Sequence, residues 1–143
     1  MNKKEYHTSS PEETALAAKE IAQSLAPGAV LALHGDLGAG KTVFSRAFAR
    51  ALGITEHVSS PTFTIVQEYA YGNGNMLYHL DLYRIDNPES ALAFGVDEFL
   101  YDKNAISLVE WPERIEGLFP PHTLHLYIER AGEDERILTF KDK

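Results

Sequence analysis

Cysteine is absent from this sequence, so disulfide bonds and thiolate metal sites are excluded and a cytoplasmic protein is expected. No apolar run approaches the roughly 20 residues of a membrane-spanning helix, and the first residues lack the apolar stretch of a secretory signal. Basic residues are also few: the chain has 13 Lys and Arg but 21 Asp and Glu, which gives a net charge of -8. Neutralising phosphates drives nucleic-acid binding, so tight direct binding of nucleic acid by this chain alone is disfavoured.

The length and the apolar content are those of one folded domain. The 143 residues are 44% hydrophobic, and the sequence contains no repeat, low-complexity segment or linker. A chain of this size buries a little over ~65% of its unfolded surface. We therefore predict a single domain that spans residues 1–143.

The segment from Gly35 to Thr42, GDLGAGKT, matches the phosphate-loop pattern G-x-x-x-x-G-K-[ST] at every fixed position. An apolar run at 29–34 precedes it, and apolar residues at helical spacing follow it as far as Gly53, so the order strand, loop, helix is predicted. Glycines let backbone N–H groups converge on a phosphate, which the helix dipole also attracts. Lys41 can reach the β- and γ-phosphates, and the Thr42 hydroxyl can ligate Mg²⁺. The residues predicted to bind the nucleotide here are Gly35, Asp36, Leu37, Gly38, Ala39, Gly40, Lys41, Thr42 and Val43.

The other predicted elements complete an α/β fold. We predict a single P-loop NTPase-like domain with a central mixed, mostly parallel sheet that is flanked by helices and carries β-hairpins. The predicted elements are a helix from Ser10 to about Ala26, a hairpin with strands at 63–71 and 76–83, a helix after Asn87, a turn or helix at 96–101, a strand at 105–110, and a second hairpin with strands at 123–129 and 136–140.

Two apolar strands end in a carboxylate, Asp81 and Glu110. In an α/β sheet, ligands gather at the carboxyl ends of parallel strands. In P-loop proteins such an Asp holds the metal directly or through water, so Asp81 is a candidate metal and catalytic residue. His79 shares a strand face with Asp81, but a lone His is more often a packed residue, and no role is assigned to it.

A hydroxyl-rich connector follows the phosphate-loop helix. Many P-loop hydrolases place a nucleotide-sensing switch in this part of the chain. Ser60 and Thr62 are therefore candidates for sensing Mg²⁺ or the γ-phosphate, with ordinary turn capping as the alternative.

Four segments, GDLGAGKT, SPTFTIVQEY, HLDLYRI and LVEWPERI, occur in this order in a short chain and resemble the TsaE family. That family comprises the small bacterial P-loop ATPases of tRNA threonylcarbamoyladenosine biosynthesis. The resemblance covers Leu16 to about Pro120. It implies ATP hydrolysis with Mg²⁺ in a complex with the partner proteins TsaB and TsaD, which modify the adenosine beside the anticodon. The chain would thus meet tRNA only indirectly.

The resemblance also implies roles for individual residues. Thr42 and Glu110 would be Mg²⁺ ligands, and Asp81 would be a Walker-B-like residue needed for hydrolysis. Thr62 would belong to a switch-like loop, and Trp111 would lie near the nucleotide.

The base of the nucleotide is harder to place. Arg130 and the start of the N-terminal helix are candidate adenine contacts. Many family members carry a second Thr at the position of Val43, so a role for that hydroxyl does not transfer to this chain.

The mechanism expected from these residues is in-line attack of water on the γ-phosphate of ATP. The sequence assigns no arginine finger, so slow hydrolysis and stimulation by the partners are expected. A small-molecule or nucleotide kinase and a nucleotide-gated binding subunit without hydrolysis remain alternatives. The sequence leaves the oligomeric state of the free protein open.

Overall fold

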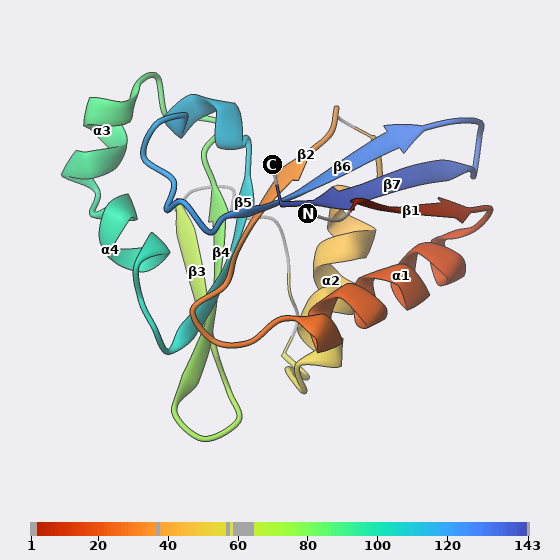
Figure 1. Ribbon diagram of the computed structural model, residues 1–143, viewed down its shortest axis with the longest axis horizontal. Helices are drawn as coiled ribbons and strands as arrows, with labels where there is room; N and C mark the ends of the chain where they lie inside the picture. The colour runs from red at the N-terminus through yellow and green to blue at the C-terminus, as the bar shows by residue number, and fades with distance from the viewer. Residues whose placement is uncertain (1–2, 37, 57, 59–64, 143) are drawn as a thin grey trace.

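The computed structural model describes residues 3–36, 38–56, 58 and 65–142 of the chain (Figure 1). Its strands are β1 (Lys3–Thr8), β2 (Val30–His34), β3 (Val66–Tyr71), β4 (Asn75–Asp81), β5 (Ala105–Glu110), β6 (Leu124–Arg130) and β7 (Arg136–Lys141). Its helices are α1 (Pro11–Ser24), α2 (Lys41–Ala51), α3 (Pro88–Ala93) and α4 (Val96–Leu100), with a 3-10 turn, η1, at Pro112–Ile115. None of the helices in these ranges has the length and apolarity needed to cross a membrane.

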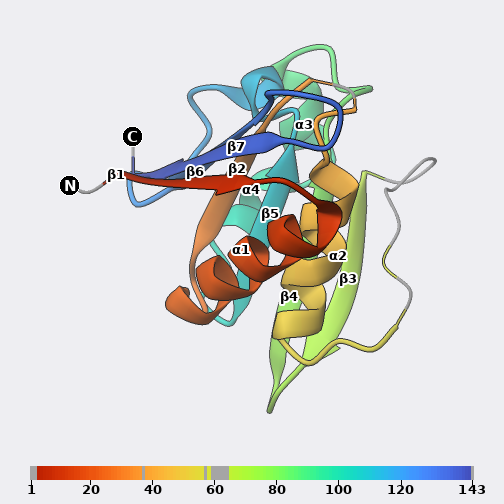
Figure 2. The same ribbon diagram turned by 90° about the vertical axis from the view of Figure 1, so that its right-hand side faces the viewer.

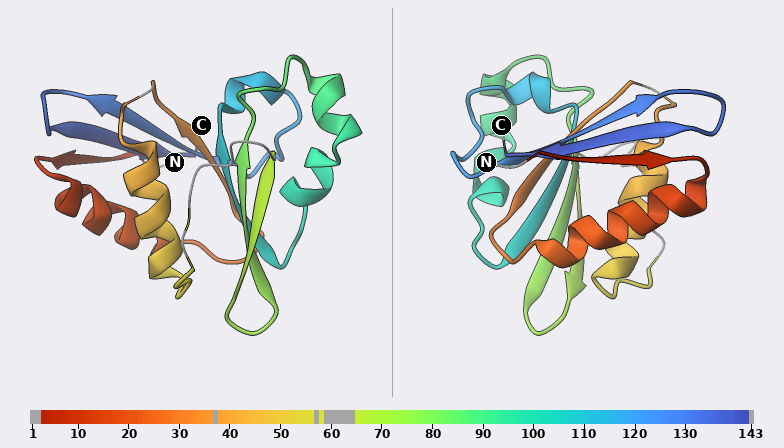
Figure 3. Two further views of the ribbon diagram at one scale, coloured as in Figure 1. Left: turned by 180° about the vertical axis from the view of Figure 1, so that it is seen from behind. Right: turned by 45° about the vertical axis from the view of Figure 1, so that its right-hand side comes forward.

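The strands of the described ranges form one seven-stranded sheet in the order β1-β7-β6-β2-β5-β4-β3. The four strands at its centre, β6, β2, β5 and β4, pair in parallel. The pairs β1 with β7, β6 with β7 and β3 with β4 are antiparallel and form the two edges. The predicted α/β fold with a mixed sheet and two hairpins is therefore confirmed, and the β3–β4 hairpin projects beyond the rest of the sheet (Figure 3).

Helices cover the sheet on two sides. The helices α1 and α2 lie side by side against one face, and α3, α4 and η1 lie on the other side (Figures 1 and 2). Strand β2 contributes to both cores, since Leu31 and Leu33 pack with α1 and α2 whereas Val30 packs with α4. This double burial explains why β2 is a continuous apolar run and not an alternating one.

The helix starts follow the capping signals of the sequence. The Ser10 hydroxyl accepts a hydrogen bond from the Glu13 backbone N–H at 3.2 Å, and the Glu13 carboxylate accepts one from the Ser9 N–H at 2.8 Å. The Asn87 side chain likewise accepts from the Ser90 N–H at 2.9 Å at the start of α3. These bonds satisfy donors that a helix leaves unpaired at its first turn.

Strand β1 was not predicted from the sequence. It pairs with β7 at one edge of the sheet, in a register that joins Lys4 to Phe140 and Tyr6 to Leu138. Most of its side chains are exposed, and Thr8 is its buried residue. An edge strand of this kind lacks the apolar alternation by which strands are recognised, so only the tertiary pairing reveals it.

Candidate functional site

The phosphate-loop residues connect the carboxyl end of β2 to the first turn of α2. Gly38 and Gly40 have φ angles of 80° and 104°, a conformation that other residues rarely adopt. Gly40 is the N-cap of α2 and supplies no side-chain acceptor to the first-turn N–H groups. These donors and the positive end of the helix dipole suit an anion. Leu37 lies outside the described residues.

Gly35 is required by space and not by its φ angle. A Cβ atom at this position would lie 2.9 Å from the Ile128 carbonyl oxygen and 3.3 Å from the Ala39 Cβ. Where the loop begins, after the end of β2, its backbone is therefore in close contact with the backbone of β6. Any side chain at Gly35 would push the loop away from β6.

Arg136, to which the sequence analysis gave no role, holds the loop from outside. Its Nε donates to the Ala39 carbonyl at 2.8 Å, and its Nη2 donates to the Gly38 carbonyl at 3.3 Å. Its Nη1 donates to three carbonyls of the β6–β7 turn, those of Gly132, Glu133 and Glu135. Arg136 thus ties the loop to that turn. No local pattern marks this residue, since its loop partners are 97 and 98 positions away.

Lys41 is buried although it is charged, with 7% of its surface exposed. Its Nζ lies 4.5 Å from the centroid of the Trp111 ring, a cation–π contact. Trp111 has a φ of 59° and is the only non-glycine residue of the described ranges with a positive φ. Its ring also meets the Tyr83 ring edge to face, with 5.0 Å between centroids. The loop lysine is therefore held against the residue that follows β5.

Asp81 and Glu110 lie side by side at the carboxyl ends of β4 and β5, where the parallel register pairs them directly. Burial raises the pKa of the Asp81 carboxyl above its ordinary value, the hydrogen bond from the Tyr83 N–H (3.0 Å) opposes this, and the charge of Glu110 adds to the increase. Glu110 is 4% exposed, and its Oε2 lies 2.5 Å from the Nε2 of His79. The sequence analysis missed this contact.

The acidic pair fits a magnesium nucleotide better than a metal held by protein alone. Among the described residues, no group of three or more His, Asp or Glu side chains could hold a metal ion. Mg²⁺ at phosphate sites takes one or two carboxylates together with water and phosphate oxygens. Asp81 and Glu110, paired at the ends of β4 and β5, could supply such carboxylates.

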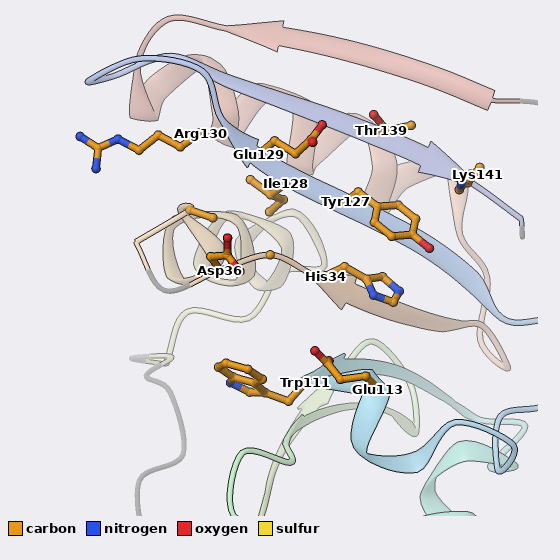
Figure 4. Close-up of a pocket in the computed structure, with 12 residues that line it drawn as sticks. His34, Asp36, Trp111, Glu113, Tyr127, Ile128, Glu129, Arg130, Thr139 and Lys141 are labelled. Carbon is orange, nitrogen blue, oxygen red and sulfur yellow. The ribbon is translucent and has the colours of Figure 1, made fainter.

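A cleft of about 570 Å³ adjoins the loop at Gly35, Asp36 and Ala39. Figure 4 shows its two walls, β6 and β7 on one side and Trp111 with Glu113 on the other. His34 stacks on Tyr127 with 4.2 Å between ring centroids.

His34 is also hydrogen bonded, through its Nε2, to the Nδ1 of His125 at 3.0 Å. Burial, with the charge of His125 adding to it, lowers the pKa of His34 to about 4. The cleft therefore has a neutral imidazole in its wall at physiological pH.

The two candidate adenine contacts lie at different hollows. Arg130 lines the large cleft, but its side chain extends away from the other labelled residues, and its Nε donates to the Gly132 carbonyl at 3.0 Å (Figure 4). The start of α1 lines a separate hollow of about 40 Å³, together with Gly40 and Val43. The two hollows are neighbours, because Arg130 pairs across β6 and β7 with Arg136, which lines the hollow at α1. Both adenine contacts stay predictions. Ser60 and Thr62 lie outside the described residues.

Residues 8–138 of the chain match the family model of TsaE, the threonylcarbamoyl adenosine biosynthesis protein. Among curated proteins, the chain is 47% identical over 141 residues to the tRNA threonylcarbamoyladenosine biosynthesis protein TsaE of Bacillus subtilis, covering 98% of this chain and 86% of that protein. It is 39% identical over 127 residues to the protein of the same name from Rickettsia felis, covering 88% of this chain and 72% of that protein.

A solved structure agrees with these matches. The crystal structure of YdiB from Bacillus subtilis superposes with a TM-score of 0.83 at 43% identity, and covers 99% of this chain and 86% of that one. Both the sequence and the fold are thus similar to these proteins over most of this chain.

Proposed function

The chain belongs to the TsaE family, which takes part in tRNA threonylcarbamoyladenosine biosynthesis, and from this premise we propose that it binds and hydrolyses ATP in that process. The proposal rests on one arrangement above all. A phosphate loop with a buried lysine lies beside two carboxylates that β4 and β5 present at neighbouring strand ends. We place the activity in the cytoplasm.

The loop and Lys41 bind the phosphates. The first-turn N–H groups of α2 donate to the β-phosphate oxygens, and the Lys41 ammonium exchanges its contact with the Trp111 ring for the β- and γ-phosphates. Since a cation–π contact is worth about 0.5–2 kcal/mol, the much stronger attraction of a triphosphate displaces it.

The acidic residues and Thr42 hold Mg²⁺. The Thr42 hydroxyl and Glu110 would be its ligands, and the ion would supply positive charge that stabilises the transition state. Asp81 would accept a hydrogen bond from a water held by the ion or from the attacking water. In-line attack of that water breaks the bond between the γ-phosphorus and the bridging oxygen and releases phosphate and ADP.

Partner proteins complete the reaction. We propose that a complex of the TsaB and TsaD type binds this chain and carries the tRNA, because the net charge of -8 disfavours direct RNA binding. Groups supplied by a partner are commonly worth ~10³ to 10⁵ in rate. Hydrolysis by this chain alone is therefore slow.

The test measures free phosphate released from ATP, with and without the purified partner proteins. Lys41→Ala abolishes both ATP binding and hydrolysis, whereas Lys19→Ala, a change of an exposed lysine on α1, leaves them unchanged. Phosphate found on a small acceptor would instead indicate a kinase. Equal turnover with and without partners, or hydrolysis that survives Lys41→Ala, would contradict the proposal.

A binding subunit without significant hydrolysis is distinguished by Glu110→Ala. This variant loses hydrolysis, and it is assayed for tRNA modification over many turnovers with the partners present. Modification that stops after the first turnovers supports the ATPase. Modification that continues would favour a nucleotide-gated binding subunit.

A further inference from the structure

His79 forms a buried hydrogen bond with the proposed metal ligand Glu110. It lies two residues before Asp81 on β4, it is 1% exposed, and its Nε2 is 2.5 Å from the Glu110 Oε2. An ionised carboxylate only accepts hydrogen bonds, so Nε2 carries the hydrogen and donates it. The bond joins neighbouring strands at the edge where the phosphate loop also lies.

Core packing alone does not account for an imidazole at this position. The Nδ1 of His79 is buried and has no hydrogen-bond partner, and a buried polar atom without a partner costs about 1–3 kcal/mol. The neighbouring buried residues of β4, Leu77 and Leu80, are apolar and carry no such cost. An aliphatic side chain at residue 79 would fill the space more favourably, so the imidazole is explained by what its Nε2 contacts.

Glu110 is a side chain whose orientation needs to be fixed. Its carboxylate stands on a flexible side chain, and the paired Asp81 repels it because both are acidic and adjacent in register. A metal ligand that is held in one rotamer loses less entropy when the ion binds, and hydrogen bonds to ligating carboxylates commonly provide this restraint.

We propose that His79 is a positioning residue for Glu110: its Nε2–H engages Oε2 and leaves Oε1 as the oxygen available to a magnesium nucleotide. This inference rests on the proposed function, since it assumes that Glu110 ligates Mg²⁺. It adds a residue that acts through Glu110 and does not itself touch the nucleotide.

The test compares three substitutions of His79. In His79→Gln, the side-chain amide nitrogen comes near the position of the imidazole Nε2 and keeps the donor. The shorter His79→Asn keeps polarity but does not reach Glu110, and His79→Leu removes the donor. Tyr78→Phe is the matched control, because it removes a hydrogen bond of the same strand, that of the Tyr78 hydroxyl to Asp102 at 2.6 Å, in the other core of the protein.

The readout is Mg²⁺ affinity and not only activity. Calorimetry measures ATP binding with Mg²⁺ and in EDTA, and the fluorescence of Trp111, the only tryptophan, follows Mg²⁺ titrations of the ATP complex. His79→Leu and His79→Asn weaken Mg²⁺ binding by about 10- to 100-fold and leave ATP binding in EDTA unchanged. His79→Gln recovers most of the Mg²⁺ affinity, and Tyr78→Phe matches the natural protein.

Several results overturn the inference. Mg²⁺ affinity that is unchanged in His79→Leu, but reduced in Glu110→Ala, refutes the positioning role and leaves the proposed function intact. An equal loss of ATP binding with and without Mg²⁺ means a general structural defect, which also refutes it. If His79→Leu does not fold, the inference is tested by comparing the Mg²⁺ affinities of His79→Gln and His79→Asn, and equal affinities refute it. If the natural protein itself binds no ATP, the proposed function fails first.

Discussion

Removing Arg136 should loosen the phosphate loop and weaken ATP binding. Its guanidinium donates to two loop carbonyls, at 2.8 Å to Ala39 and 3.3 Å to Gly38, and holds both against the β6–β7 turn. With these carbonyls held on the outer side, the loop keeps the backbone conformation in which its N–H groups can converge on a phosphate. Arg136→Ala frees the loop, so ATP must order it on binding.

The size of the effect follows from the geometry. A hydrogen bond to a charged group contributes about 1.5–3 kcal/mol, but Arg136 is only partly buried and the 3.3 Å bond is long. Counting the Ala39 bond alone at the lower end gives about 1.5 kcal/mol, which corresponds to roughly a tenfold increase in Kd. The bonds to the turn contribute to folding, so the free energy of unfolding should fall by about 1 kcal/mol.

Calorimetric ATP titration and urea unfolding of Arg136→Ala, Arg136→Lys and Arg50→Ala measure these quantities. Lysine keeps the charge but lacks the planar fork, so it should recover only part of the affinity. Arg50 is exposed in the last turn of α2 and serves as the control. ATP affinity in Arg136→Ala equal to that of the natural protein would refute the reasoning, and full recovery by lysine would assign the effect to charge.

Two further predictions concern stability. Gly35→Ala should lower the free energy of unfolding by about 1–3 kcal/mol and weaken ATP binding, because its Cβ would lie 2.9 Å from the Ile128 carbonyl. Gly53→Ala is the control: Gly53 has a φ of +91°, and an added Cβ would have no atom within 4 Å. This change should lower the free energy of unfolding by about 1 kcal/mol and leave ATP affinity unchanged, as urea unfolding and calorimetry would show. Unfolding free energy should also fall as pH drops from 6.5 towards 4, because unfolded His34 takes up a proton near 6.5 and the folded form only near 4. Because His34 is partly exposed, the expected loss of unfolding free energy is discounted to about 1–2 kcal/mol. If His34→Phe shows the same dependence of unfolding free energy on pH as the natural protein, His34 is not its cause.

The parts of the proposed site that depend on local sequence patterns could be predicted from the sequence. The phosphate-loop glycines, the strand before them and the helix after them form one continuous segment. Asp81 and Glu110 could be placed together because parallel strands present their carboxyl ends at one edge, and the register pairs them directly. Their roles in catalysis stay predictions.

What the sequence missed depends on contacts between distant residues. Arg136 reaches the loop across 97 positions, and His79 reaches Glu110 across 31. Arg136 belongs to no pattern, and His79, although it opens the HLDLYRI segment, was given no role because a lone His in a strand is more often a packed residue. Strand β1 is exposed along most of its length and is defined only by its pairing with β7. Such features appear only when the whole fold brings their partners together.

Trp111 lies next to Glu110 in the sequence and in contact with Lys41 of the phosphate loop, and its backbone conformation is unusual. A bulky residue with a φ of 59° is strained by about 1–2 kcal/mol, and such strain persists only where the surroundings enforce it. Here Trp111 lies between Glu110 at the end of β5 and Pro112 at the start of η1, and its ring is in contact with Lys41 and Tyr83. The ring thus lies beside the Lys41 ammonium, the group that binds phosphates in the proposed function. Because Trp111 directly follows Glu110 in the sequence, its enforced backbone conformation fixes the Lys41 contact and the proposed metal ligand at adjacent residues.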